Sequence, residues 1–332
     1  MQAESGIMRV LITGATGFVG GALARALCND GTEVHALVRP TSDGSMLDGV
    51  PVHFHQGDVT APETLRSALD GASWVIHAAG PLGEAGVPEE VYRRVHVEGT
   101  RNLLAAVSSM GTKLRVLHVS TPGVLGRSAG GQAPEDAPYA PNNPYERAKA
   151  AAEQAALEFA AQGLPVIIAR PGFMYGPGDR HVLRLFQAVQ RGRFFYIDGG
   201  RHFCHPTFIA DAVEGMLLCL TRGRPGAVYH ITGPRPVRFR ELAETIADAV
   251  GVSAPRLSLP KGLAMAGAAG LEVLGRMTGL TPPLSRAGVD FFGEDRQHSS
   301  QKAHDELGYV PRYDLKDGVD RTVAWYRERN WL

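Results

Sequence analysis

A tyrosine and a lysine stand four residues apart in the segment NPYERAKA, residues 143–150. Asn143 is a good N-cap and Glu146 can reach back to close a capping box, so a helix should begin at Tyr145 or one residue before it. Residues four apart share a helix face, which puts the Tyr145 hydroxyl beside the Lys149 ammonium. A nearby cation lowers the pKa of a phenol from about 10, so the pair could move a proton near neutral pH.

The same spacing also fits an exposed aromatic residue beside a solvated lysine, so the surrounding elements must decide. Runs rich in Val, Ile and Leu alternate with helix-length segments, which indicates βαβ units. We therefore predict an α/β fold with a Rossmann-type, doubly wound parallel sheet. The expected strands are 8–13, 33–38, 51–56, 73–78, 114–119, 165–170 and 227–232, and the expected helices lie near 18–30, 62–70, 88–109, 143–162 and 208–221.

The chain changes character after residue 171, where it becomes irregular and rich in Gly, Pro and Arg, and after residue 233 it is mostly helical. We expect a smaller, mostly helical C-terminal substrate lobe. The predicted division is a dinucleotide-binding Rossmann domain, 1–171 plus about 208–232, and a substrate-binding lobe, 172–207 plus 233–332.

A glycine-rich turn follows the first predicted strand and precedes a helix. Glycines at such a turn let the backbone approach a pyrophosphate, and the helix N-terminus offers free N–H groups and a positive dipole end. The alternative is a purely structural turn, but the strand–turn–helix context favours a dinucleotide. The expected contacts are Gly14, Thr16, Gly17, Phe18, Val19 and Gly20.

The end of the second predicted strand lacks the acid that would hydrogen-bond the adenosine ribose of NAD. Arg39 stands there instead and could pair with a 2′-phosphate, so NADP is favoured over NAD; stacking on adenine would fit either cofactor. Asp58 and Val59 follow the third strand, and Asp58 can accept from the adenine amino group. Ala78, Ala79 and Gly80 follow the fourth strand and offer a wall of small residues.

Composition excludes several function classes. Lys+Arg and Asp+Glu are both 34, so no basic field points to nucleic acid or an anionic membrane. Three scattered cysteines fit neither a disulfide framework nor a zinc site, and together with the lack of a signal-peptide or transmembrane segment they favour the cytoplasm. The histidines, among them His53 and His55 on one strand face and His202 and His205 in a loop, lack a carboxylate cluster, so we expect no metal site.

Taken in order, these motifs resemble the extended short-chain dehydrogenase/reductases, also called the NAD(P)-dependent epimerase/dehydratase family. The resemblance covers nearly all of the chain and weakens after residue 233. It rests on Gly14-x-x-Gly17-x-x-Gly20, Asp58-Val59, Ala78-Ala79-Gly80, Ser120-Thr121, Tyr145-x-x-x-Lys149 and Arg170-Pro171, followed by Tyr175-Gly176-Pro177-Gly178-Asp179.

The resemblance implies hydride transfer between nicotinamide and a secondary alcohol or ketone. It makes Tyr145 the proton donor or acceptor, Lys149 the group that lowers its pKa and holds the nicotinamide ribose, and Thr121 a second hydrogen-bond partner of the substrate oxygen. Residues expected along the nicotinamide are Pro171, Gly172, Phe173 and Met174. Two alternatives stay open: a nucleotide-sugar epimerase or dehydratase that retains its NAD(P), and a non-catalytic dinucleotide-binding regulator.

Three features bear on finer points. His96 stands where the family commonly has an asparagine that supports a proton relay, so it is either a substitute relay or a core histidine. Phe173 and the Cys204-His205 region replace residues that hold a sugar diphosphate in relatives, which favours a small non-nucleotide substrate. The apolar run 263–271, with Met277, Phe291 and Phe292, could wall its pocket, although nearby arginines could bind phosphate instead; those are Arg180, Arg184, Arg191, Arg193 and Arg201.

We also expect a homodimer. The predicted helix 143–162 carries small residues that permit close helix approach, and with the helix near 88–109 it matches the pair that forms a dimer interface in many relatives. The alternative is that these residues pack against the chain's own sheet. They are Ala148, Ala151, Ala152, Ala155 and Ala156.

Overall fold

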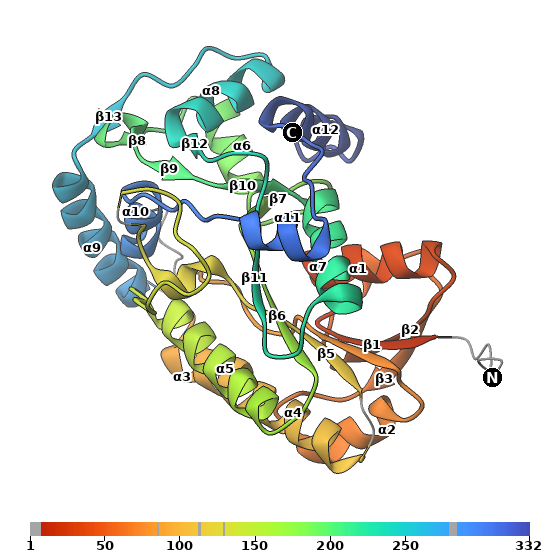
Figure 1. The fold of residues 1–332 in the computed structure, drawn as a ribbon. Coiled ribbons are helices and arrows are strands. Elements are labelled where there is room, and N and C mark those ends of the chain that lie inside the picture. Colours follow the sequence, from red (N-terminus) through yellow and green to blue (C-terminus); the bar gives the residue numbers. More distant parts are fainter. Residues whose placement is uncertain (1–7, 85, 112–113, 129, 279–283) are drawn as a thin grey trace.

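The structure is a computed structural model that describes residues 8–84, 86–111, 114–128, 130–278 and 284–332. Seven strands form one parallel sheet in the order β11-β6-β5-β4-β1-β2-β3 (Figure 1). Each coincides with a predicted strand, so the predicted Rossmann-type sheet is confirmed. The strands are β1 (Arg9–Thr13), β2 (Glu33–Val38), β3 (Val52–Gln56), β4 (Trp74–His77), β5 (Arg115–Val119), β6 (Val166–Pro171) and β11 (Val228–Ile231).

Helices cover both faces of the sheet because its strands are apolar on both faces. On β1, Val10 and Ile12 enter one core cluster and Leu11 the other, as alternating residues on a strand must. Helices α1 (Phe18–Asn29) and α7 (Ile209–Arg222) contribute to the first cluster. The second cluster is closed by α2 (Leu65–Leu69), α4 (Gly99–Ser109) and α5 (Pro144–Ala161).

Helix α5 begins as its sequence predicted. The Asn143 side chain accepts a hydrogen bond from the Glu146 N–H at 2.9 Å. Glu146 reaches back as well, but it accepts from the N–H of Asn142 at 2.9 Å, one residue before the expected partner. Four of the five alanines expected at a dimer interface face the chain itself and are buried within one protomer, namely Ala148, Ala152, Ala155 and Ala156. These four therefore lend no support to a dimer interface.

The second lobe is built from short strands and helices above the carboxyl ends of the sheet. Three two-stranded sheets pair β10 with β7, β12 with β9 and β13 with β8. Its elements are β7 (Phe173–Tyr175), α6 (Leu183–Gln190), β8 (Tyr196–Ile197), β9 (Phe203–Cys204), β10 (Pro206–Phe208), β12 (Val237–Arg238), α8 (Phe239–Val250), β13 (Ser258–Leu259), α9 (Lys261–Thr278), α10 (Arg286–Phe292) and α12 (Leu315–Glu328). Two further helices pack on the sheet side of the molecule: α3 (Glu89–Tyr92) contacts α5, and α11 (Gln301–Leu307) contacts α7 and β11.

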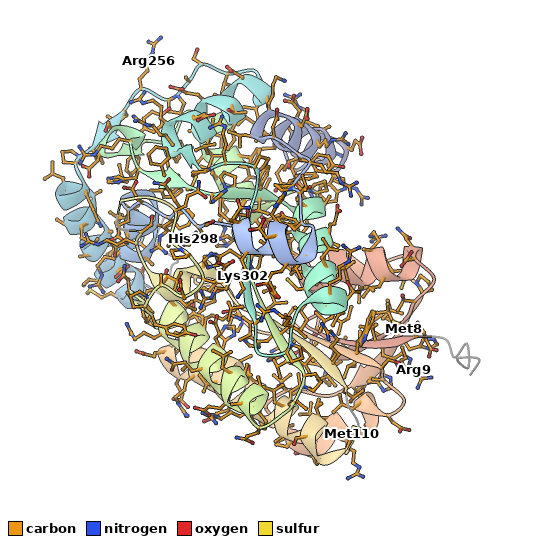
Figure 2. The ribbon with its side chains drawn as sticks, in the orientation of Figure 1. Met8, Arg9, Met110, Arg256, His298 and Lys302 are labelled. Atoms are coloured by element: carbon orange, nitrogen blue, oxygen red, sulfur yellow. The ribbon has the colours of Figure 1, made fainter. Side chains whose placement is uncertain are left out.

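Helix α11 lies against the sheet rather than within the lobe to which the sequence assigned it. Lys302 of this helix is labelled in Figure 2. Its Nζ donates to the Val228 carbonyl of β11 at 2.9 Å, and Arg222 of α7 donates to the Leu307 carbonyl at 2.9 Å. The division into two domains remains a prediction.

Helix α9 carries the apolar run. Its inner residues Ala264 and Ala268 are buried in a small cluster with Val289, whereas Leu263 and Met277 are 66% and 80% exposed. The last two therefore do not wall a pocket as the sequence suggested. Within the described part of the chain, no helix is both long and apolar enough to cross a membrane.

Candidate active site

The glycine turn after β1 has two glycines in close backbone contact and a third that is exposed to solvent. Gly14 has a φ of +77°, and a Cβ there would lie 2.6 Å from the Ala78 carbonyl oxygen. A Cβ on Gly20 would lie 2.2 Å from the Gly14 carbonyl oxygen. Gly17 is exposed, and no side chain caps the α1 N–H groups that follow it. These free donors, with Thr16, Phe18 and Val19 around them, fit a phosphate group.

The other adenosine-side predictions lie at the same edge, because parallel strands end together. Arg39 follows β2 and is exposed; its backbone N–H donates to Ser42 Oγ at 3.2 Å. Asp58 follows β3, where its Oδ1 accepts from the N–H and hydroxyl of Thr60 at 2.8 and 2.9 Å. Val59 is buried and faces Gly99 of α4. Asp58 Oδ1 therefore stabilises the loop that follows β3.

The segment after β4 packs closely against the ring of His96. Ala78 and Ala79 are half-buried, and a Cβ on Gly80 would lie 2.0 Å from the His96 ring. His96 sits in a π-helical turn, Arg93–Glu98, a feature frequent at functional sites. Its Nε2 donates to the Pro81 carbonyl at 3.0 Å, which leaves Nδ1 as the acceptor of a neutral ring. Burial, followed by the charge of Lys149, lowers the pKa of His96 to about 3.

Tyr145 lies under the loop that joins β4 to α3. A Cβ on Gly83 would approach the Tyr145 ring to 3.0 Å, and the rings of Tyr92 and His96 meet it edge-on at centroid distances of 5.8 and 5.6 Å. The Tyr92 hydroxyl fixes this loop by accepting from the Glu84 N–H at 3.0 Å. Burial, then the Glu146 charge, raises the pKa of Tyr145. The lowering expected from Lys149 is thus not seen in this structure, where burial dominates.

Lys149 stands one helical turn further along α5 and is buried. Its Nζ donates to the Val119 carbonyl at the end of β5, at 2.6 Å. Burial lowers its pKa to about 8, with Glu153 acting in the opposite direction. Thr121, two residues after Val119, is half-buried, and its hydroxyl accepts from the Gly123 N–H at 3.2 Å. Lys149 and Thr121 therefore lie where β5 ends beside α5, and Tyr145 stands one turn before Lys149 on that helix.

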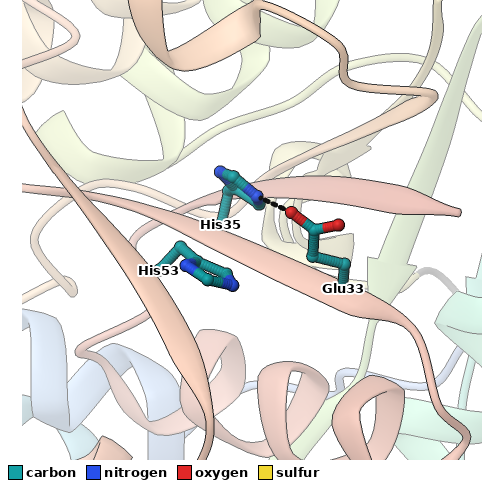
Figure 3. Close-up of side chains that lie close together, drawn as sticks. All are labelled: Glu33, His35 and His53. Carbon is teal, nitrogen blue, oxygen red and sulfur yellow. Dashed lines mark hydrogen bonds and ion pairs between the residues drawn. The ribbon is translucent and has the colours of Figure 1, made fainter. Parts of the chain in front are cut away.

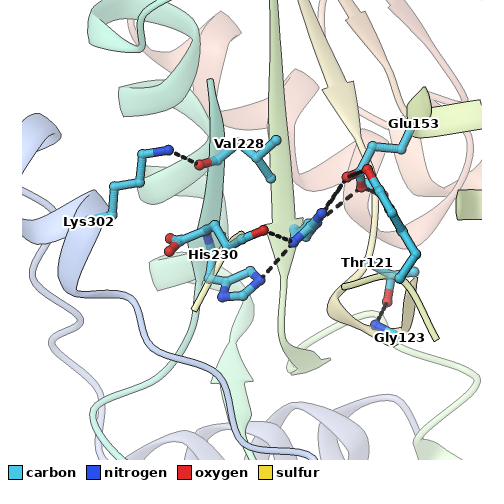
Figure 4. A network of polar contacts seen from close by, with 10 residues as sticks. Thr121, Gly123, Glu153, Val228, His230 and Lys302 are labelled. Carbon is cyan, nitrogen blue, oxygen red and sulfur yellow. Dashed lines mark hydrogen bonds and ion pairs between the residues drawn. The ribbon is translucent and has the colours of Figure 1, made fainter. Parts of the chain in front are cut away.

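Below Lys149 lies a buried polar network that the sequence reading missed (Figure 4). Glu153, another turn along α5, is fully buried and accepts from Arg170 of β6 at 2.5 to 3.2 Å. Glu153 also accepts from Ser120 at 2.5 Å and from Tyr139 at 2.7 Å. The repeat Tyr145-x-x-x-Lys149-x-x-x-Glu153 was the available signal, since it puts an acid on the same helix face.

The predicted nicotinamide-side residues follow β6. A Cβ on Gly172 would lie 2.6 Å from Thr207 Oγ1, so the backbone passes close to β10 here. Pro171 is buried, while Phe173 and Met174 are half-buried in β7. The Phe173 ring lies 5.2 Å from that of Phe291 in α10, and this starts an aromatic wall that continues to Phe292 and Phe239.

A second missed pair joins the lobe to α5. Arg296 is buried and its Nη1 donates to Glu146 Oε1 at 2.7 Å, and Glu146 follows Tyr145 directly in α5. Its guanidinium carbon lies 5.8 Å from the Phe291 ring centroid. Among the described residues, Arg296 Nε has no hydrogen-bond partner. A contact between residues 150 apart leaves no local signal in a sequence.

Known proteins with similar sequences span the whole chain. The model of the "NAD dependent epimerase/dehydratase family" matches residues 10–232. A ketoreductase of a farnesylated dihydroquinoline oxide from Stigmatella aurantiaca is 32% identical, over 94% of this chain and 95% of the relative. A 2-alkyl-3-oxoalkanoate reductase from Stenotrophomonas maltophilia is 31% identical, over 96% of this chain and 99% of the relative.

Solved structures agree in fold. A dTDP-glucose 4,6-dehydratase from Streptomyces venezuelae, solved with NAD bound, has a TM-score of 0.80 and 28% identity, over 98% of each chain. The family match extends over two thirds of the chain, from β1 to the end of β11. This chain is a member of the NAD-dependent epimerase/dehydratase family and an NAD(P)-dependent enzyme, as its sequence predicted.

Proposed function

We propose that this NAD(P)-dependent enzyme is a reductase or dehydrogenase of an apolar ketone or secondary alcohol, and that Tyr145, Lys149 and Thr121 are its catalytic residues. One observation carries the proposal. Helix α5 presents Tyr145 and, one turn later, a buried Lys149 at the edge of the sheet where the open glycine turn also lies. A dinucleotide bound along this edge supplies the hydride donor or acceptor.

The chain's own residues account for the proton. Because burial raises the pKa of Tyr145, its hydroxyl keeps its proton at neutral pH and can donate it to a substrate oxygen during reduction. Lys149 is cationic below a pH of about 8, and its charge favours the phenolate that forms when the proton leaves. Thr121 offers a second hydroxyl to the same oxygen.

The aromatic wall supports an apolar substrate. Phe173, in the predicted nicotinamide segment, meets Phe291, and two reductases among the relatives have a farnesyl or an alkyl group in the names of their substrates. Two of the arginines that could have bound phosphate lie elsewhere. Arg180 and Arg191 line a surface hollow with Trp331, which follows α12 in the chain. Helices α12 and α10 lie on opposite sides of the lobe (Figure 1).

A nucleotide-sugar epimerase or dehydratase is the second candidate, and Arg296 is the observation that favours it. Its unpartnered Nε, buried beside Phe291 and close to the start of α5, could donate to an anionic oxygen. Glu146 already neutralises this arginine, however, so it offers one donor rather than a free charge. We rank this candidate below the apolar ketone.

Tyr145→Phe tests the catalytic assignment. We expect kcat to fall by about 10²–10⁴-fold with NADPH affinity unchanged, because only the proton donor is removed. Tyr229→Phe is the matched control. Tyr229 lies on β11, and the substitution removes a hydroxyl that donates to Glu306 of α11 at 2.7 Å. If Tyr145→Phe turned over every accepted substrate at the parent rate, a dinucleotide-binding regulator would become the better description.

Thermal stabilisation separates the substrate classes. We expect a panel of apolar ketones, added with NADPH, to raise the Tm more than UDP, GDP or dTDP does. Stabilisation by a nucleoside diphosphate alone would reverse the ranking of the two candidates.

Arg39 supports NADP as the cofactor. The residue is exposed at the end of β2, and among the described residues its guanidinium has no hydrogen bond or ion pair. A charge-assisted contact to a 2′-phosphate should make NADPH bind about tenfold more tightly than NADH. Fluorescence titration of parent and Arg39→Ala with both cofactors tests this, and equal affinities in the parent would leave Arg39 without a role in selection.

A homodimer through α4 and α5 remains part of the proposal, although not through the buried alanines. The outer faces of these helices are polar and are joined by the Arg101–Glu158 ion pair at 2.9 Å. Sedimentation at micromolar concentration should show twice the 35.5 kDa chain mass. A charge reversal at Glu158 should weaken the dimer if this face forms it.

We place the protein in the cytoplasm. The three cysteines are free thiols, and Cys204 and Cys219 are buried in the core, as suits a reducing compartment. Fractionation of the native host would test this placement, and recovery in a secreted or membrane fraction would contradict it.

A further inference from the structure

We propose that Glu33, His35 and His53 form a binding site for a divalent transition-metal ion of the zinc type, separate from the dinucleotide site (Figure 3). The three residues lie on β2 and β3, the last two strands of the sheet. Glu33 begins β2, whereas the dinucleotide edge begins after its last residue, roughly 17 Å further along the strand.

Strand geometry brings these side chains together. Glu33 and His35 are two residues apart on β2 and so point to the same face of the sheet. His35 and His53 are direct neighbours in the parallel pairing of β2 with β3. The expectation of no metal site rested on the lack of a carboxylate near His53, and the pairing of the two strands supplies one from 20 residues away in sequence.

The donor set suits zinc. Each residue offers one ligand atom, and these three atoms lie within 4.8 Å of one another. Zinc bound at about 2.0–2.2 Å to imidazole nitrogen and carboxylate oxygen needs its ligand atoms roughly 3.5 Å apart. His53 is exposed and its ring stacks on that of His35 at 4.9 Å, but it makes no hydrogen bond within the described residues, so the ring can rotate to close this gap. Three protein ligands leave a fourth position for water.

The surroundings orient the ligands as metal sites require. His35 Nδ1 lies 2.6 Å from His55 Nε2, so one nitrogen of the central histidine is fixed by a second imidazole while its Nε2 faces Glu33 Oε1 at 2.7 Å. Arg9 holds the same carboxylate oxygen at 3.0 Å. Both contacts are to Oε1, which leaves Oε2 for a cation, and a bound ion would replace the hydrogen bond between His35 and Glu33.

A bound ion would stabilise the β3 edge of the sheet. β3 pairs only with β2 in the sheet order, and it exposes His53 and Phe54 to solvent. A ligand that binds the folded state stabilises it by mass action, so metal bridging β2 to β3 should raise the Tm. This inference does not depend on the proposed reaction, because its readouts need no turnover.

The test uses the full chain, stripped with EDTA and desalted. Calorimetric titration with ZnCl₂ should show one equivalent bound, and zinc should raise the Tm of the parent. His53→Gln should weaken binding at least about tenfold and abolish the Tm rise, because one of three ligands is lost. Glu33→Gln, which keeps the side-chain shape, should weaken it too.

His304→Gln is the matched control. It removes another exposed histidine, 3.0 Å from the Asp305 carboxylate, where no second histidine completes a donor set among the described residues. It should leave zinc binding unchanged. Zinc binding that survives in both His53→Gln and Glu33→Gln, or no binding by the parent at millimolar ZnCl₂, would overturn the proposal.

Discussion

Two parts of the proposed active site are built from opposite kinds of contact. We call the polar network around Glu153 the floor and the aromatic residues around Phe291 the wall. Beneath Lys149, Glu153 accepts from Arg170, Ser120 and Tyr139, and all of these except the half-buried Tyr139 are removed from water. On the lobe side, Phe173 and the rings beyond it meet through edges and faces with no hydrogen bonds among them. The floor depends on a complete polar network, whereas the wall depends on shape and apolar area.

This difference teaches where the site can vary. A buried ion pair that loses one partner leaves a charge without compensation, so substitutions in the floor are costly. An aromatic wall loses only contact area when a ring is changed. Chemistry at Tyr145 should therefore be fixed by the floor, and substrate choice should be adjustable in the wall.

Glu153→Gln should show the largest effect. Removing the carboxylate leaves the Arg170 guanidinium buried without its counter-charge, which should lower the free energy of unfolding by about 3–5 kcal/mol. Urea unfolding of the parent and the variant measures this. Glu244→Gln, which breaks an exposed ion pair with Arg240 on α8, is the control and should change it by less than about 0.5 kcal/mol. Equal losses would contradict the floor's dependence on a complete network.

Lys149 should give the floor a pH-dependent stability. Its pKa is about 8 in the folded chain, below the ordinary lysine value of 10.5, so between these pH values the unfolded state binds more protons and stability rises with pH. The contribution is on the order of 3 kcal/mol and is complete near pH 10.5. Lys149→Met should lack this rise.

Urea unfolding at pH 7.5, 9 and 10.5 compares the two proteins. Subtracting the Lys149→Met profile from that of the parent removes the other titrating groups, because both chains share them. A flat difference would mean that Lys149 is not desolvated as the structure indicates.

The sequence predicted the sheet well because alternating apolar runs and helix caps are local signals. The seven strands, the glycine turn and the start of α5 at Asn143 all belong to this class. What it missed depends on pairing between distant elements. Arg296 reaches Glu146 across 150 residues, and Glu33 meets His53 only because two strands pair in one register. The closure of residues 81–84 over Tyr145 likewise follows from packing by Tyr92 and His96.

Phe291→Ala should test the wall. The ring contacts Phe173, Phe239 and Phe292, so its loss removes apolar area from the proposed substrate side without changing Tyr145, the proposed proton donor. We expect KM for an apolar ketone to rise about tenfold, while kcat changes less than threefold, because uniform binding is lost. Phe291→Leu, which keeps most of the apolar volume, should recover much of the affinity. A kcat loss as large as that of Tyr145→Phe would show that the wall also orders the catalytic groups.

Leu263→Gln should show the smallest effect. It tests whether the wall extends to the outer face of α9. Leu263 is 66% exposed on the outer face of α9, while Ala264 beside it is buried against Ile197 and Val289. Only the inner face belongs to the packed lobe, so the outer substitution should change the free energy of unfolding by less than about 0.5 kcal/mol and leave KM unchanged. Ala264→Gln should cost at least about 1–3 kcal/mol, because it forces a larger polar group into a packed cluster. If Leu263→Gln instead altered KM or the sedimentation mass, the outer face of α9 would be in contact with substrate or with a second chain in solution.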